Sequence, residues 1–127
     1  MKYKNDEERF ASRRYSSIKS RVNYDLEKKW SREDFIKWWV AHDKKCCYCK
    51  CTIDELHKFY KITKSKRKST RGKTLEVERK KDKKYKKDNC ELCCYWCNNA
   101  KSDVFSYEEF INIGSEIGKV IRKKINK

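Results

Sequence analysis

Apolar residues recur at helical spacing in the first third of the chain. From residue 6 to about residue 24 the sequence is polar apart from apolar side chains three to five positions apart: Phe10, Tyr15, Ile18 and Val22. A second set follows Ser31 and consists of Phe35, Trp38 and Trp39. Side chains three or four positions apart share one face of a helix, and Ser31 with Asp34 forms a weak capping box. The pattern therefore predicts two helices in residues 1–44, with the aromatic residues in a packed core.

The C-terminal residues show a long helical repeat. Ser106 and Glu109 have the spacing of a capping box at its start. Apolar residues then follow at intervals of three and four: Phe110, Ile113, Ile117, Ile121 and Ile125. We predict an amphipathic helix over residues 106–127 that packs on the rest of the protein, the alternative being a surface that joins two copies in a homodimer. Gly114 and Gly118 either weaken this helix or allow a close approach.

The middle of the chain predicts a short sheet. Leu75–Glu78 alternates apolar and acidic residues, as a half-buried strand does, and Cys90–Leu92 is a candidate for the returning strand. Thr52–Tyr60 and Tyr95–Lys101 predict short helices, whereas Lys61–Lys73 has no periodicity and predicts a flexible loop. The order of elements indicates an α+β fold whose core occupies residues 45–105, with helices before and after it.

Composition limits the hydrophobic core. The chain has 127 residues, of which 43% are charged and 37% hydrophobic, and it contains no proline. A chain of this length forms one domain, and so polar a chain buries little apolar surface. We therefore expect a bound metal to stabilise the fold.

Eight cysteines in two clusters supply candidate ligands for that metal. No apolar signal-peptide segment follows Met1, so we expect a protein that is not secreted, in which Cys-x-x-Cys pairs bind zinc more often than they form disulfides. In a strand Cys90 and Cys93 would point to opposite faces, whereas Cys94 and Cys97 bracket a turn into a helix. The sequence predicts a structural Zn²⁺ site with four cysteine ligands: Cys46, Cys49, Cys94 and Cys97.

This assignment leaves four cysteines as ordinary small residues: Cys47, Cys51, Cys90 and Cys93. An exchange of Cys47 or Cys51 into the zinc site stays open. The two histidines, His42 and His57, stand apart from the clusters, so we expect them to be exposed or to pack rather than to bind the metal.

Positive charge is concentrated between the two cysteine clusters. The formal net charge is +16, and residues 58–87 hold 15 Lys and Arg against 3 Asp and Glu, with Tyr60 and Tyr85 interleaved. Cations clustered in this way favour contacts with a phosphate backbone over a merely solvated surface. We expect the partner to be a nucleic acid, with DNA the first candidate. No apolar run approaches the roughly 18 residues that a membrane span requires, so we expect no membrane partner.

Residues 45–110 resemble the HNH (ββα-metal) nuclease family. Its members combine a Cys-x-x-Cys pair, a strand that ends in Asp-His, a central Asn, a returning strand, and a second Cys-x-x-Cys followed by His or Asn and then Lys. This sequence carries similar residue types in the same order: Leu75–Arg79, Asn89, Cys94, Cys97, Asn98 and Lys101. An Arg-type subgroup, found among phage proteins and restriction enzymes, has Arg in place of the strand His. In that subgroup a Phe-Ser-x-x-Glu stretch follows the Lys, as Phe105–Glu109 does here.

The resemblance implies a metal-dependent DNA endonuclease with a second, catalytic metal site. It places Glu78 at the family's Asp and Asn98 at the final His or Asn, and these two residues would hold Mg²⁺ or Mn²⁺. Asn89 would brace the loop between the strands, and Lys101 would contact phosphate. Arg79 stands where the general-base His usually is, and because Arg is a poor base we interpret it as a phosphate clamp.

Three features of this site differ from the usual family pattern or stay open. Glu78 is one methylene longer than Asp, and positioning errors near 1 Å can cost ~10²-fold in rate. Glu76 lies two residues earlier, hence on the same face of the strand, where it would compete or assist. Tyr48 is a candidate general base, because Arg-type members carry Tyr there, and simple packing in the knuckle is the alternative.

The sequence thus favours an endonuclease that hydrolyses DNA, with two alternatives. A zinc-stapled nucleic-acid-binding protein with a degenerate, non-catalytic HNH site would share the same charge and cysteines. A zinc protein that packs nucleic acid in a virion would share them as well. The Lys- and Asn-rich composition favours a phage or virus, so we expect the cytoplasm of a bacterial host, or the nucleus or cytoplasm of an infected eukaryotic cell.

Overall fold

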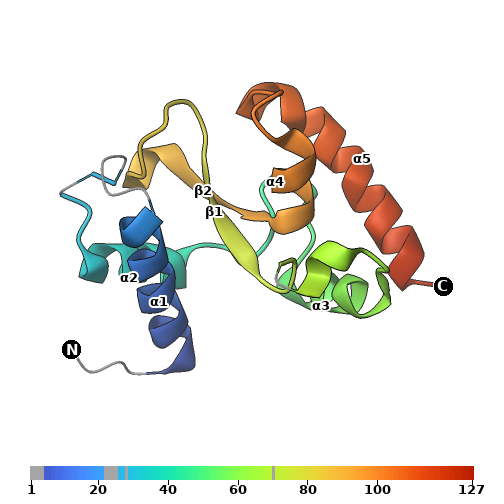
Figure 1. The fold of residues 1–127 in the computed structure, drawn as a ribbon, viewed down its shortest axis with the longest axis horizontal. Coiled ribbons are helices and arrows are strands. Elements are labelled where there is room, and N and C mark those ends of the chain that lie inside the picture. The colour runs from blue at the N-terminus through green and yellow to red at the C-terminus, as the bar shows by residue number, and fades with distance from the viewer. Residues whose placement is uncertain (1–4, 22–25, 28, 70) are drawn as a thin grey trace. The chain divides into compact units, whose positions relative to one another are not determined.

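The computed structural model describes residues 5–21, 26, 27, 29–69 and 71–127, and the chain divides into two compact units (Figure 1). The first unit consists of residues 1–43 and 82–90, and the second of residues 44–81 and 91–127. The elements in chain order are α1 (Asp6–Arg21), α2 (Arg32–Ala41), α3 (Ile53–Ile62), the 3₁₀ helix η1 (Lys66–Ser69), β1 (Leu75–Arg79), the 3₁₀ helix η2 (Lys87–Asn89), β2 (Cys90–Cys94), α4 (Tyr95–Lys101) and α5 (Tyr107–Ile125). The predicted α+β fold class is confirmed, while the proposed end of the first helix at residues 22–24 lies outside the described residues.

The first unit has an aromatic core between α1 and α2. Ser31 caps α2, because its hydroxyl accepts a hydrogen bond of 3.1 Å from the backbone N–H of Asp34. The aromatic residues of α2 are buried, and the ring of Trp39 lies 5.4 Å from the ring of Phe10 on α1. These side chains are packing residues, as their helical spacing predicts.

The second unit contains the sheet, except for Cys90 at the start of β2. Strands β1 and β2 pair with each other, and α4 packs against β1. Leu75 at the start of β1 and Leu92 in β2 are both fully buried. Cys94 ends β2 and caps α4, since its sulfur accepts a hydrogen bond from the N–H of Cys97. This strand-to-helix turn places the second cysteine pair directly before the residues of α4 that the family resemblance singles out.

Helix α5 lies close to the first cysteine cluster because two of its residues lack a side chain. A Cβ atom at Gly114 would overlap the Cβ of Tyr48, and one at Gly118 would overlap the carbonyl oxygen of Cys49. One turn later the guanidinium of Arg122 donates a hydrogen bond of 3.1 Å to the same carbonyl and another to a carboxylate on α3. The two glycines therefore permit close packing of α5 within the second unit.

The structure differs from the flexible loop predicted at residues 61–73. Helix α3 continues to Ile62, and the hydroxyl of Tyr60 donates a hydrogen bond of 2.8 Å to the carbonyl of Lys68. Gly72 has a φ of +95°, which glycine adopts without strain, and a Cβ there would overlap the ring of Trp96. Contacts from aromatic side chains to backbone hold this segment, and such contacts leave no hydrophobic periodicity in the sequence.

Candidate metal centres and active site

Both cysteine pairs lie in tight turns in which a backbone N–H group donates a hydrogen bond to a cysteine sulfur. In the first turn the N–H of Lys50 donates to the carbonyl of Cys46 at 3.0 Å, and the N–H of Tyr48 donates to the sulfur of Cys46 at 3.4 Å. In the second turn the N–H of Cys97 donates to the sulfur of Cys94, also at 3.4 Å. Hydrogen bonds from backbone N–H groups stabilise a thiolate over a thiol. The turns are therefore built to present charged sulfur ligands.

The two turns bring four sulfur atoms together in the interior. The sulfurs of four buried cysteines all lie within 4.8 Å of one another: Cys46, Cys49, Cys94 and Cys97. The sulfurs of Cys49 and Cys94 are 3.8 Å apart. Sulfurs that surround a zinc ion tetrahedrally at ~2.3 Å are separated by about 3.8 Å. The donor set and its spacing fit a structural zinc ion, and four protein ligands leave no coordination position for a substrate.

The other four cysteines are buried outside this group. Burial raises the pKa of Cys47 and Cys93, so both thiols stay protonated and behave as small apolar side chains. Cys51 lies beside the cluster, and its hydrogen bond with Cys49 raises the pKa of Cys51. Hydrogen bonds from neighbouring thiols, that of Cys46 first, lower the pKa of Cys49. Cys51 therefore stays a thiol beside the group of four.

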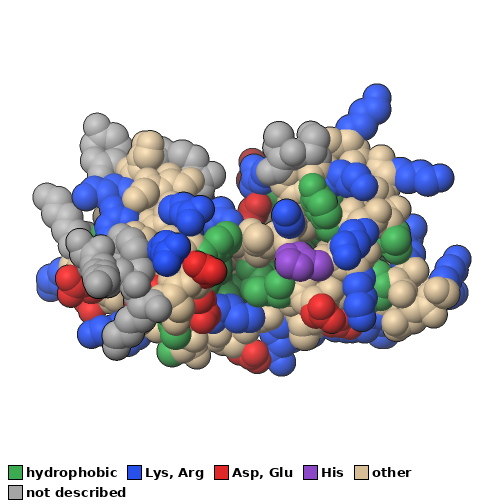
Figure 2. Space-filling model, turned by 90° about the horizontal axis from the view of Figure 1, so that it is seen from below, with side chains coloured by type: hydrophobic (Ala, Val, Ile, Leu, Met, Phe, Trp, Pro, Cys, Tyr) green, Lys and Arg blue, Asp and Glu red, His purple; other side chains and the backbone are tan. Residues whose placement is uncertain are grey.

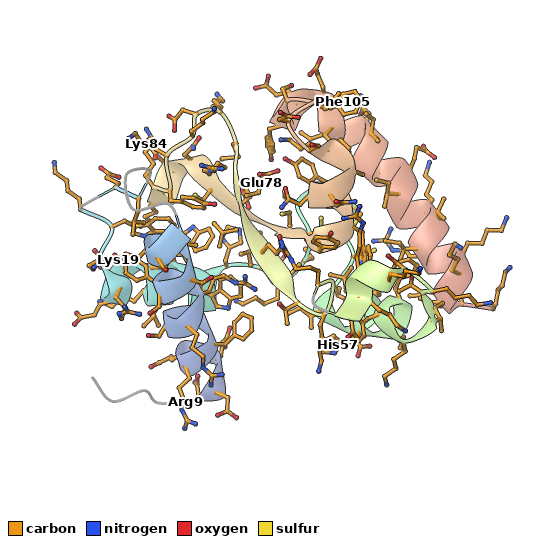
Figure 3. The ribbon with its side chains drawn as sticks, viewed as in Figure 1. Arg9, Lys19, His57, Glu78, Lys84 and Phe105 are labelled. Carbon is orange, nitrogen blue, oxygen red and sulfur yellow. The ribbon has the colours of Figure 1, made fainter. Side chains whose placement is uncertain are left out.

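Glu78 occupies the interior of the second unit, between β1 and α4 (Figure 3). The hydroxyl of Tyr48 donates a hydrogen bond of 2.6 Å to Glu78 Oε2, and the ammonium of Lys101 lies 3.6 Å from the same oxygen. The backbone N–H of Arg79 donates to Glu78 Oε1 at 3.1 Å. A buried carboxylate with a cation and two hydrogen bonds is compensated for its loss of water. The chain holds this charge in place from three different elements.

Asn98 contacts the other carboxylate of β1. Its side-chain N–H donates a hydrogen bond of 3.1 Å to Glu76 Oε1. Glu76 in turn accepts a forked pair from Arg71, with nitrogen–oxygen distances between 2.8 and 3.1 Å. Because side chains two apart in a strand share a face, Glu76 and Glu78 lie on the same side of β1. Of the two predicted ion ligands, Asn98 therefore contacts Glu76, while Glu78 contacts Tyr48 and Lys101.

Tyr48 packs in the interior with its ring and contacts Glu78 with its hydroxyl. Its ring is fully buried and packs edge-on against Phe110, with ring centroids 5.1 Å apart, and also against Tyr107. Its hydroxyl meets Glu78. Burial, together with the hydrogen bond to that carboxylate, raises the pKa of Tyr48 far above its usual range. In this state Tyr48 is a hydrogen-bond donor and not a base.

Asn89 lies in the first unit and is buried. Its side-chain N–H groups donate to the carbonyls of Asp82 and Lys84 at 2.9 and 2.8 Å. The same segment pairs with residue 27, whose N–H donates to the carbonyl of Tyr85 at 3.0 Å. Asn89 thus ties together the loop that precedes β2. These bonds give Asn89 the geometry of a brace.

Two partners in this site could not be recognised from the sequence. Arg71 comes before β1 in a segment without periodicity, so no spacing rule places it on Glu76. The contact of Tyr48 with Glu78 joins residues 30 positions apart, which no local spacing rule encodes. The alternation of β1 does indicate that Glu76 shares the face of Glu78. This is the signal in the sequence that points to Glu76 as a site residue.

Comparison with known proteins identifies the fold. No protein-family model and no curated protein matches the chain. Among solved structures it is similar to the rare-cutting HNH restriction endonuclease PacI. The TM-score is 0.69 at 21% sequence identity, and the match covers 94% of this chain and 89% of that of PacI. The likeness indicates an HNH-like fold, in agreement with the two strands, the helix α4 and the four-cysteine group. Among the described residues no helix is both long and apolar enough to cross a membrane.

Proposed function

We propose that this protein is a metal-dependent endonuclease that hydrolyses phosphodiester bonds in DNA. The observation that carries the proposal is the group formed by two carboxylates of β1 with the amide of Asn98 and the ammonium of Lys101 from α4. This group lies in an HNH-like fold, and the similar structure, PacI, is a DNA-cutting HNH enzyme.

Glu78 and Asn98 are the proposed ligands of the catalytic ion. Carboxylate and amide oxygens are the donors that Mg²⁺ and Mn²⁺ prefer, and a carboxylate that already attracts the Lys101 ammonium and the Tyr48 hydroxyl is suited to a cation. When bound, a divalent ion at such a site supplies Lewis-acid stabilisation of the phosphate and lowers the pKa of a water molecule. The residues present therefore fit the ion.

Three side chains are proposed to bind the DNA phosphate or to position the ion ligand Glu78. The ammonium group of Lys101 would leave Glu78 and contact a phosphate oxygen. The flexible four-carbon side chain of lysine permits this movement. Arg79 clamps the phosphate, since its guanidinium is a fixed cation with several donors. Tyr48 holds the carboxylate of Glu78 in one orientation. Preorganised charges of this kind stabilise the negative charge that develops during phosphodiester hydrolysis.

The four-cysteine group is proposed to hold Zn²⁺ as a structural element. A small, highly charged chain has limited apolar surface to bury, and a four-thiolate zinc site contributes folding energy directly. The zinc also fixes the turn that carries Tyr48 and the turn that begins α4. Loss of the zinc should therefore disturb the active site without removing any catalytic group.

DNA affinity is proposed to come mainly from the cations of residues 58–87. This segment carries 15 Lys and Arg against 3 acidic residues, and it contributes to both units. Figure 2 shows Lys and Arg side chains spread over the face seen from below. Contacts to phosphate give affinity without sequence readout, and they release counterions from DNA.

The test is a cleavage assay with zinc-loaded protein on supercoiled plasmid, single-stranded DNA and branched DNA, with Mg²⁺ or Mn²⁺ added. We expect cleavage that requires the added ion and that Glu78→Ala abolishes, while Glu116→Ala, an exposed carboxylate on α5, leaves it intact. Tight DNA binding without cleavage under either ion would refute the enzyme and support the non-catalytic binding protein.

A further inference from the structure

Arg71 covers the carboxylate of Glu76 with a forked ion pair. Three hydrogen bonds join the guanidinium to both oxygens of Glu76, the shortest at 2.8 Å. The side chain of Glu76 is only 13% exposed, whereas that of Arg71 is 42% exposed. The carboxylate is thus built into the site, and the cation that neutralises it comes from the surface side.

Asn98 contacts Glu76 through its amide N–H, and the oxygen of the same amide group is the atom that would bind an ion. The amide N–H of Asn98 donates to Glu76 Oε1 at 3.1 Å, so the amide and this carboxylate are already in direct contact. An oxygen ligand set for Mg²⁺ or Mn²⁺ gains affinity from each added carboxylate charge. Glu76 is therefore placed to act as a ligand beside Asn98, and the guanidinium of Arg71 occupies the position of a counter-cation.

We propose that Glu76 is a third protein ligand of the catalytic ion, and that Arg71 is a latch which competes with the ion for Glu76. This inference rests on the proposed function and concerns the regulation of the same site. An aromatic ring also holds the guanidinium of Arg71, which lies over the ring of Tyr95, 4.7 Å from its centroid. The ion must displace a cation that is held by both a carboxylate and an aromatic face.

The two carboxylates of β1 have different partners. Glu78 is paired with Lys101 and Tyr48 in the interior, at distances of 3.6 and 2.6 Å. Glu76 is paired with a guanidinium that is 42% exposed and can therefore move into solvent. The carboxylate that is easier to release from its cation is thus Glu76.

The test measures Mn²⁺ affinity directly, by the electron paramagnetic resonance signal of free Mn²⁺ during titration of the zinc-loaded full-length protein. Glu76→Gln keeps the acceptor for Asn98 but removes the charge, and we expect affinity at least ~10-fold weaker. Arg71→Ala should bind Mn²⁺ about 3- to 10-fold more tightly, because the competing cation is gone. Lys73→Ala removes an equal charge from the same segment and should change affinity less than about 2-fold.

The outcomes separate this inference from the proposed function. If the wild-type protein cleaves plasmid with Mn²⁺ while Glu76→Gln binds Mn²⁺ as tightly as wild type, the role of Glu76 is refuted and the nuclease proposal stands. If Arg71→Ala and Lys73→Ala change affinity equally, the latch is refuted. If the wild-type protein neither binds Mn²⁺ nor cleaves DNA, both proposals fail.

Discussion

Replacement of Gly114 by alanine should destabilise the second unit, although alanine is the better helix former. In an exposed helix interior the change from glycine to alanine stabilises by about 1 kcal/mol. At Gly114 the new Cβ would overlap the Cβ of Tyr48 and approach that residue's backbone carbon atoms at 3.0 and 3.1 Å. Atoms of a backbone cannot rotate away, so α5 must move outward.

The magnitude follows from the two opposing terms. Overpacking of a well-packed interior costs about 1–3 kcal/mol, and rigid neighbours place this site toward the upper part of that range. After subtraction of the helix-propensity gain, Gly114→Ala should lower the free energy of unfolding by about 1–2 kcal/mol. Ser115→Ala, an exposed change at the next position, should leave it unchanged or raise it slightly.

The assay is urea unfolding followed by far-ultraviolet circular dichroism, with release of zinc to a coloured chelator recorded in parallel. Zinc release reports on the second unit, where the four cysteines lie. The midpoint of both signals should fall for Gly114→Ala and not for Ser115→Ala. If Gly114→Ala were as stable as Ser115→Ala, the close packing of α5 on the first cysteine turn would be wrong.

Three further predictions follow from the same contacts. Cys97→Ser should abolish the stoichiometric zinc that atomic absorption measures, whereas Cys90→Ser should retain it; equal zinc in both variants would refute the ligand assignment. Tyr48→Phe should lower the free energy of unfolding by about 1.5–3 kcal/mol, because buried Glu78 loses a charge-assisted hydrogen bond, and an unchanged urea midpoint would contradict that contact. DNA affinity should fall steeply between low and moderate salt, and removal of one phosphate-contacting cation such as Lys83 should reduce the slope by about 1, whereas a flat salt response would exclude the basic segment as the contact surface.

Local signals predicted much of the fold. The capping residues Ser31 and Ser106 begin α2 and α5 where their spacing indicated, and α4 has the predicted limits Tyr95–Lys101. Alternation along the second strand excluded Cys90 and Cys93 as a ligand pair and left Cys94 and Cys97, and the structure collects the four predicted sulfurs into one group. These features depend on residues close in sequence, where side-chain direction follows from backbone geometry.

Contacts between residues that are distant in sequence could not be predicted from capping residues or from the alternation of side chains. The sequence indicated that Glu76 and Glu78 share a face, but the choice of carboxylate for Asn98 depends on how α4 packs on β1. The ion pair from Arg71 depends on a segment with no hydrophobic period. Likewise, residues 82–90 belong to the first unit through backbone pairing near residue 27, which no side-chain pattern encodes.

The most direct test of the central claim is the relaxation of supercoiled plasmid by zinc-loaded wild-type protein and by Glu78→Ala, each with and without Mn²⁺. Nicked or linear DNA should appear only with wild-type protein and added Mn²⁺, while both proteins retard the plasmid equally in a binding gel. Cleavage by Glu78→Ala at the wild-type rate, or the absence of cleavage by a wild-type protein that binds DNA, would contradict a catalytic metal site on β1.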